Sequence, residues 1–397
     1  MSGLGGHLAA LLEPFGPGDE VIPGARFVRA SAELGLRLTF ELEGRIVHLE
    51  VALAGEGQRF AARTDRLLLS YRTGTGSGDH LTSEAGVALC RAIAGVVQRN
   101  EDRVLASIAS DAALARQSTL GSTRVRELRV ASLLEPAEWQ GTRYYTASPY
   151  LGCLIGCRFC YAQSRVGMLR RLGGLSEVAW GSYVDVLSNA PELIAAELEQ
   201  LAVAPIKFCP VVSDPYQAIE ARLELTRRSL DAIRASARPF PTIVLTRAAL
   251  IARDAALIGS LPMAYAGMSI PTLDDDVRRH FEPRAASIPE RLATLTTLRD
   301  AGARTFAVIQ PMLPGPLEPF ADALAARVSS ASLDVLTTLE GAAEDFADPR
   351  YALARDQGWQ RERAAELAEA LATRGVAVWH GELPPELCAP SPVQALV

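Results

Sequence analysis

From about residue 140, short apolar runs typical of buried strands alternate with stretches that have the periodicity of amphipathic helices. Such repetition implies a parallel sheet with right-handed crossovers. Six strand–helix units predict an α/β fold, a partial (β/α)6 barrel over residues 140–385, with functional groups at the carboxyl ends of its strands. The predicted strands span 142–148, 205–212, 240–246, 263–270, 304–310 and 333–339, and the helices span 190–203, 221–237, 251–260, 286–301, 317–329 and 355–374.

Residues 1–125 have a different pattern and predict a small α+β accessory domain before the barrel. Alternating apolar and polar residues indicate strands, with Glu43-Gly44 at the position of a hairpin turn. This part of the chain contains no catalytic constellation. Its predicted elements are a helix at about 6–13, strands within 36–53 and 60–72, a glycine-rich loop at 73–78, and a long helix from about 82 to 117.

Composition narrows the class of protein. The 397 residues are 49% hydrophobic and 22% charged, which is typical of a globular chain with a sizeable core. The net charge of -6 provides no general attraction for nucleic acid, although Arg165, Arg170 and Arg171 form a local basic candidate. We find no secretory leader and no apolar run long enough to span a membrane, so we expect a soluble, cytoplasmic protein.

Three of the six cysteines, Cys153, Cys157 and Cys160, lie within eight residues in a C-x3-C-x2-C arrangement after the first predicted barrel strand. Thiolates are the usual protein ligands of iron–sulfur clusters. Three sulfurs would leave one iron of a [4Fe–4S] cluster without a protein ligand, and Gly152 and Gly156 permit a tight loop. The alternatives are a zinc site, which usually needs a fourth ligand, or three buried thiols. The cluster interpretation is favoured because no second cysteine pair and no histidine lie nearby.

This spacing, with the aromatic Phe159 before the third cysteine, resembles the radical S-adenosylmethionine (SAM) superfamily. The resemblance implies that the open iron binds the amino and carboxylate groups of SAM. It also implies that the reduced cluster cleaves SAM to methionine and a 5′-deoxyadenosyl radical, which abstracts a hydrogen atom from a substrate. A flavodoxin-like or ferredoxin-like protein is the expected one-electron reductant.

Further segments resemble the branch that includes the spore photoproduct lyase-like proteins, and together they cover about residues 145–320. Two departures from that branch are Ala218, where proline is usual, and Arg247, where lysine is common. The matching residues are Ser213-Asp214-Pro215-Tyr216-Gln217 with Glu220 and Leu225-Thr226-Arg227, then Val244-Leu245-Thr246-Arg247 with Arg253-Asp254, then Gly267-Met268-Ser269-Ile270 with Glu282-Pro283 and Arg291-Leu292.

The resemblance places Ser213, Arg247 and Ser269 beside SAM, at the ends of the second, third and fourth strands. A guanidinium is a forked donor that suits the SAM carboxylate, and serine hydroxyls suit its ribose or methionine part. The alternative for each is ordinary strand-end chemistry. Glu282 is expected either to hold a SAM group or to pair with a buried arginine.

Two residues are candidates for returning a hydrogen atom to the product radical. Spore photoproduct lyase uses a cysteine at the end of the second strand and a tyrosine just after the third cluster cysteine. Tyr161 stands at the tyrosine position, and Cys209 lies on the second strand two residues before the matching place, which preserves the face of the strand. The alternative for Cys209 is a small buried side chain.

The substrate is not identified by any motif. We favour a peptide, a protein or a small metabolite because of the acidic balance, the shifted cysteine and the additional N-terminal domain. One alternative is repair of thymine photoproducts in DNA, and another is a non-catalytic iron–sulfur protein with a sensing role.

Overall fold

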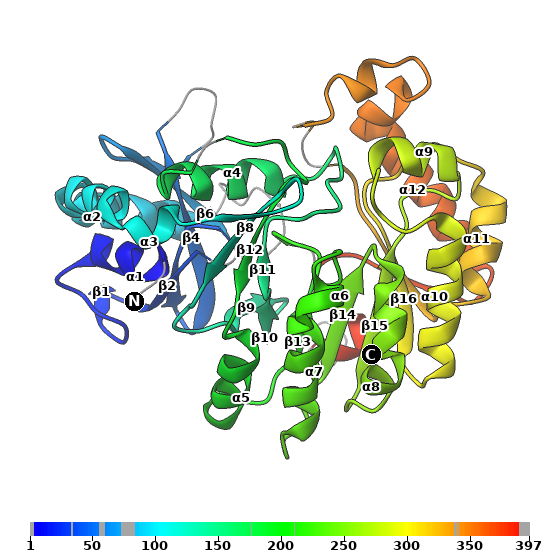
Figure 1. Cartoon of the computed structure of the whole chain (residues 1–397), viewed down its shortest axis with the longest axis horizontal. Helices are drawn as coiled ribbons and strands as arrows, with labels where there is room; N and C mark the ends of the chain where they lie inside the picture. The colour runs from blue at the N-terminus through cyan, green and yellow to red at the C-terminus, as the bar shows by residue number, and fades with distance from the viewer. Residues whose placement is uncertain are drawn as a thin grey trace.

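The computed structural model describes residues 4–32, 35–54, 60–72, 84–175, 177–209, 211–336, 339 and 341–388. The predicted glycine-rich loop at 73–78 lies outside these ranges. Figure 1 shows a blue sheet from the N-terminal part of the chain on one side and the barrel strands, flanked by helices, on the other.

The first sheet is antiparallel and has the order β1-β2-β3-β4-β6-β5. The predicted hairpin is confirmed, since Leu42 pairs with Arg45 and the two turn residues, Glu43 and Gly44, both have positive φ. The long predicted helix ends earlier than expected, because Asp111 is extended and caps a separate short helix by accepting a hydrogen bond from the Ala113 amide. The elements are α1 (Leu4–Ala9), η1 (Ala10–Leu12), β1 (Glu20–Ile22), β2 (Ala25–Ser31), β3 (Arg37–Leu42), β4 (Arg45–Leu53), β5 (Ala62–Arg63), β6 (Leu67–Arg72), α2 (Glu84–Ser110) and α3 (Ala112–Ala115).

The second sheet confirms the predicted partial barrel. Its strand order is β18-β17-β16-β15-β14-β13-β10-β9, and all neighbours are parallel except the edge strand β9. The predicted sixth strand was placed about three residues too late, and β9 and β18 were not predicted. The strands are β9 (Glu135–Trp139), β10 (Thr142–Ala147), β13 (Ile206–Phe208), β14 (Thr242–Thr246), β15 (Ala264–Ser269), β16 (Arg304–Ile309), β17 (Ser330–Leu333) and β18 (Ala377–Trp379).

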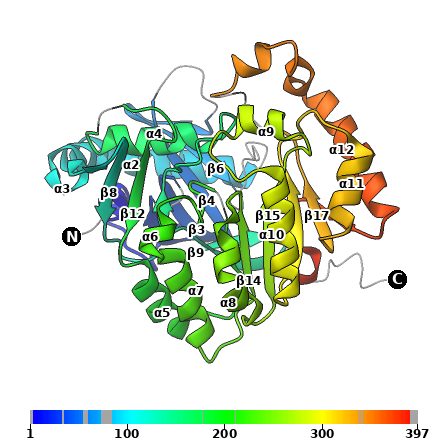
Figure 2. The ribbon, with the colours of Figure 1, turned by 45° about the vertical axis from the view of Figure 1, so that its right-hand side comes forward.

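Helices cover the outer face of this sheet, and every predicted helical pattern forms a helix there (Figure 2). They are α5 (Ala190–Gln200), α6 (Glu220–Leu223) with α7 (Leu225–Ala235), η2 (Ala249–Asp254) with α8 (Ala255–Gly259), α10 (Ile288–Asp300), α11 (Leu317–Ala325) and α12 (Gln357–Ala372). The acidic run Asp274-Asp275-Asp276 indicates a helix start from the sequence, and α9 (Asp275–Phe281) begins there. The sequence did not predict α4 (Ala162–Leu172) or the small sheet of β7 (Ser118–Leu120), β8 (Thr123–Leu128), β11 (Tyr150–Leu151) and β12 (Tyr183–Leu187).

The first sheet packs against the edge strand of the barrel through buried polar contacts. The carboxylate of Glu135 on β9 accepts a hydrogen bond from Ser31 at 2.7 Å and lies 3.7 Å from the guanidinium of Arg37. His48 lies 3.8 Å from the same carboxylate. These four side chains are fully buried, so the N-terminal sheet covers a strand that would otherwise be exposed. The boundaries of the two domains, 1–125 and 140–385, stay predictions. None of the helices described here is long and apolar enough to cross a membrane.

Candidate active site

A cavity of about 360 Å³ opens at the carboxyl ends of the barrel strands. It brings together nine of the ten residues that the sequence nominated, while Glu282 lies behind its wall. The nine lining residues are Cys153, Cys157, Phe159, Cys160, Tyr161, Cys209, Ser213, Arg247 and Ser269.

The three nominated thiols lie on one tight loop. Gly152 and Gly156 have φ values of +80° and +66°, and a Cβ on Gly152 would come within 2.9 Å of Tyr183. Both positions therefore require glycine. In the described part of the chain, no three His, Cys, Asp or Glu side chains are arranged to hold a single metal ion. The thiols instead share the wall of a cavity, an arrangement that suits a cluster of several iron atoms better than one zinc ion.

The Ser-Asp-Pro-Tyr-Gln segment holds this loop in place. Ser213 donates a hydrogen bond to the Gly152 carbonyl at 2.7 Å. Gln217 donates to the Ser213 hydroxyl at 2.6 Å and accepts from the Leu154 amide at 2.7 Å. Gln217 is fully buried, so it fixes the loop without facing the cavity. Ser213 faces the cavity and supports the loop at the same time.

Asp214 joins the ends of two neighbouring strands. One of its oxygens accepts hydrogen bonds from the Thr246 hydroxyl at 2.5 Å and from the Tyr216 amide at 2.9 Å, and the other accepts from the Arg247 amide at 2.8 Å. Burial raises the pKa of Asp214, although these hydrogen bonds favour the carboxylate. This geometry gives Asp214 a turn-forming role at the ends of the two strands.

Arg247 is oriented by a buried carboxylate. Its Nε donates to Glu282 at 2.7 Å, and the guanidinium carbon lies 5.9 Å from the centre of the Phe159 ring. The second oxygen of Glu282 accepts from Arg291 at 2.5 Å, and Glu282 and Arg291 are fully buried. Of the two roles considered for Glu282, the structure shows the pairing with buried arginines.

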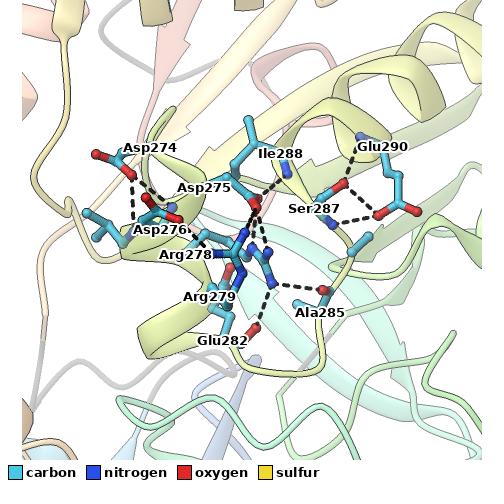
Figure 3. A network of polar contacts seen from close by, with 12 residues as sticks. Asp274, Asp275, Asp276, Arg278, Arg279, Glu282, Ala285, Ser287, Ile288 and Glu290 are labelled. Carbon is cyan, nitrogen blue, oxygen red and sulfur yellow. Dashed lines mark hydrogen bonds and ion pairs between the residues drawn. The ribbon is translucent and has the colours of Figure 1, made fainter.

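The turn between α9 and α10 fixes the position of Glu282, as Figure 3 shows. Arg278 donates to the carbonyl oxygens of Glu282 at 3.4 Å and Ala285 at 3.3 Å, and its guanidinium is held by Asp275. Asp275 also accepts from the Ile288 amide at 2.9 Å, at the start of α10. The acidic start of α9 therefore supports Glu282 through Asp275, while Asp274 caps the helix.

The two candidates for hydrogen-atom return line the same cavity. The guanidinium of Arg165 lies 5.1 Å from the centre of the Tyr161 ring, and burial raises the pKa of Tyr161 to about 12. Burial also raises the pKa of Cys209, which keeps its thiol protonated at neutral pH. Ser269 faces the cavity, and its carbonyl accepts from Arg291 at 2.6 Å.

A segment after β17 covers the cysteine loop and was not predicted. Asp345 lies 2.5 Å from Arg158, which is within the loop, and 2.9 Å from His280. The rings of Phe281 and Phe346 are 4.8 Å apart. This segment, residues 341–356, is the orange excursion near α9 in Figures 1 and 2, and we call it the cap.

Sequence reasoning also missed the far half of the cavity. Lys207 on β13 pairs with Glu382 at 2.6 Å, and Trp139 and Trp379 line the same region. A lysine two residues before Cys209 in an apolar strand was the one available sign, since residues two apart share a face. Glu382 follows β18, a strand that was not predicted, so its position beside Lys207 could not be inferred from the sequence.

The three arginines that the sequence offered as a basic patch for nucleic acid mostly contact other residues of the protein. Arg165 pairs with Glu50 at 3.2 Å, and the guanidinium of Arg170 lies 4.2 Å from the centre of the Tyr183 ring. Arg171 is half exposed and lies 3.7 Å from Glu177.

Residues 147–324 match the sequence model of the radical SAM superfamily. An uncharacterised protein of Methanocaldococcus jannaschii is 27% identical over 188 residues, which is 47% of this chain and 67% of that protein. An uncharacterised protein of Mycobacterium tuberculosis is 29% identical, over 43% of this chain and 50% of that protein. A protein of Pseudomonas phage M6 named radical SAM Nα-GlyT isomerase is 26% identical, over 42% of this chain and 33% of that protein. The chain thus spans about half or less of the mycobacterial and phage relatives.

Among solved structures, spore photoproduct lyase complexed with a dinucleoside spore photoproduct covers 60% of this chain and 76% of its own, with 18% identity and a TM-score of 0.42. A variant of that lyase has been solved with bound SAM as well. The sequence match identifies residues 147–324 as a radical SAM domain, and enzymes of the radical SAM superfamily use a [4Fe–4S] cluster and SAM.

Proposed function

We propose that Cys153, Cys157 and Cys160 bind the [4Fe–4S] cluster and that SAM occupies the adjacent part of the cavity, against Ser213, Arg247 and Ser269. The observation that carries this proposal is that all six side chains line one cavity at the carboxyl ends of the strands. When bound and reduced, this pair of cofactors supplies a radical that abstracts a hydrogen atom from the substrate.

The residues of the chain orient and enclose these groups. Ser213 and Gln217 hold the cysteine loop, as their hydrogen bonds to Gly152 and Leu154 indicate. Arg247 uses its Nε for Glu282, so other donors of its guanidinium are left for a carboxylate in the cavity. The cap shields the outer side of the loop from water through Asp345 and Phe346.

Cys209 and Tyr161 are the groups that we propose return a hydrogen atom at the end of the reaction. A protonated thiol is the form that can give up a hydrogen atom, and burial of Cys209 favours that form. Tyr161 lines the same cavity, and its O–H is the second candidate donor of the hydrogen atom.

We propose an organic substrate of the peptide, protein or small-metabolite class rather than DNA. Arg165 and Arg170, the arginines that would contact phosphates, are engaged by Glu50 and Tyr183. Repair of a thymine photoproduct in DNA is the alternative function, and the similarity to spore photoproduct lyase is what suggests it. A flavodoxin-like or ferredoxin-like reductant completes the proposal.

The test is anaerobic reconstitution with iron and sulfide, followed by reduction and incubation with SAM. Cluster absorbance and 5′-deoxyadenosine are measured for the native chain, for Cys157→Ala and for the control Cys388→Ala, whose thiol lies outside the cavity. We expect the native chain and the control to form the cluster and release 5′-deoxyadenosine, and Cys157→Ala to do neither. A native chain without a cluster, or a Cys157→Ala chain with full activity, refutes the assignment.

A further inference from the structure

The far half of the cavity contains a charged pair for which the cofactor chemistry has no use. On β13, Ile206 and Phe208 point into the main hydrophobic core, whereas Lys207 lines the cavity, as does Cys209 directly after the strand. Lys207 therefore lies in the same wall as the proposed hydrogen-atom donor, two residues from it.

Lys207 is held in place by Glu382. Its Nζ lies 2.6 Å from a Glu382 oxygen, and the two side chains are only 9% and 11% exposed. Taking two charges out of water costs several kcal/mol per ion, which the pair repays only with good geometry. An ion pair that lines an enzyme cavity at this cost is a candidate for recognition.

The segment that carries Glu382 is itself rigidly packed. Leu383 and Leu387 are buried in a cluster with Tyr144. Gly381 lies against Trp139, because a Cβ on this glycine would come within 2.1 Å of the indole ring. Glu382 therefore has little freedom to move away from Lys207.

The ammonium group has donors to spare. A lysine has three N–H donors, and among the described residues the hydrogen-bond partner of Lys207 is Glu382. The cavity around the Lys207 ammonium group is lined by aromatic side chains, among them Trp139, Phe306 and Trp379. A ligand in this region would meet N–H donors beside aromatic surfaces.

The charge balance decides which acceptor suits Lys207. Glu382 offsets the lysine charge, and Asp334 lines the cavity as a second carboxylate. Arg247 and Asp214, which also line the cavity, offset each other, so the cavity has a formal net charge of -1 when Asp334 is ionised. Burial raises the pKa of Asp334, which further disfavours a second negative charge beside it. A carboxylate or phosphate ligand would be repelled there, whereas a neutral carbonyl oxygen would be accepted without that cost.

We propose that Lys207, fixed by Glu382, binds a neutral amide carbonyl of the substrate and so places the neighbouring carbon beside Cys209. The substrate class is a carboxamide, such as the backbone of a peptide. This inference rests on the proposed function, because it assigns the reacting carbon to the same cavity.

Two small probes test the charge preference directly. N-acetylglycine N-methylamide carries neutral amides, and N-acetylglycinate carries a carboxylate in place of one of them. Their binding to the reconstituted, oxidised protein is measured by saturation-transfer NMR, which requires no turnover. The variants are Lys207→Met and Glu382→Gln, with Arg228→Met as control because Arg228 pairs with Glu192 on the exposed surface.

The native chain and the control are expected to bind the amide more tightly than the anion. Lys207→Met is expected to weaken amide binding by about tenfold, as loss of a charge-assisted hydrogen bond predicts. Glu382→Gln leaves the lysine charge uncompensated, so the preference should turn toward the anion. Equal binding of the amide to the native chain and Lys207→Met, or unchanged selectivity in a folded Glu382→Gln, overturns the proposal.

Each variant is checked by circular dichroism, and a double variant Lys207→Met/Glu382→Leu replaces any single variant that does not fold. Two apolar side chains avoid an unpaired buried charge, and this variant should still lose amide binding. Release of 5′-deoxyadenosine by the native chain tests the proposed function separately, so either proposal can fail while the other stands.

Discussion

Replacing Glu282 with alanine is expected to destabilise the barrel strongly. Glu282 accepts hydrogen bonds from Arg247 at 2.7 Å and from Arg291 at 2.5 Å, and Arg291 is fully buried. Removing one partner of a buried pair leaves an uncompensated charge and costs about 3–5 kcal/mol. The control Asp322→Ala removes a carboxylate that is 69% exposed and pairs with Arg374, for which we expect about 1 kcal/mol or less.

The chain offers a selective readout for this experiment. Its four tryptophans, Trp139, Trp180, Trp359 and Trp379, all lie after residue 125, so their fluorescence reports unfolding of the barrel and not of the N-terminal sheet. With a urea dependence of about 3 kcal/mol per molar, the Glu282→Ala midpoint should fall by about 1 M or more. If it falls no further than that of Asp322→Ala, the buried arginines do not depend on this carboxylate and the reasoning is wrong.

Three other buried or bridging side chains, His48, Gln217 and Asp345, also allow quantitative or directional predictions. Burial and Arg37 lower the pKa of His48 from 6.5 to about 4, so the folded sheet should lose about 2 kcal/mol between pH 7.5 and pH 5. Hydrogen exchange in β3 and β4 measures this loss, which His48→Asn should abolish. Gln217→Ala should lower the iron bound per chain after reconstitution, because the buried side chain that braces the cysteine loop is gone; exposed Gln98→Ala should not. Asp345→Ala should accelerate bleaching of the cluster in air by releasing the cap from Arg158, whereas Asp348→Ala, which removes a surface contact with Arg350, should leave the rate unchanged.

The features that sequence predicted best are those with local causes. The turn at Glu43-Gly44 depends on a glycine, which adopts positive φ without steric cost, and the tight cysteine loop depends on Gly152 and Gly156. The parallel strands were found because each is a short, continuous apolar run between helices. Three of the four residues of β17 are serine or alanine, so that strand was misplaced toward the more apolar residues after it.

The missed features depend on contacts between distant parts of the chain. Lys207 and Glu382 are 175 residues apart in sequence, and a lysine within an apolar strand gives no information about which carboxylate will meet it. The cap is held to the cysteine loop by Asp345 and Arg158, which are 187 residues apart. No propensity or period encodes such pairs, because burial of a charge is decided only after the strands have been brought together.

The N-terminal sheet also depends on contacts between distant parts of the chain, and through them it supports one wall of the cavity. A partial barrel leaves an edge strand with unpaired backbone groups, and here that strand, β9, carries Trp139 at the far end of the cavity. Ser31 and Arg37 hold β9 through Glu135, and Arg45 holds it through Glu138 at 2.9 Å. Since Trp139 packs against Gly381 next to Glu382, the position of the proposed amide site depends on a strand that the N-terminal sheet fixes. The N-terminal sheet therefore acts on the site through β9, and among the described residues none before Trp139 lines the cavity.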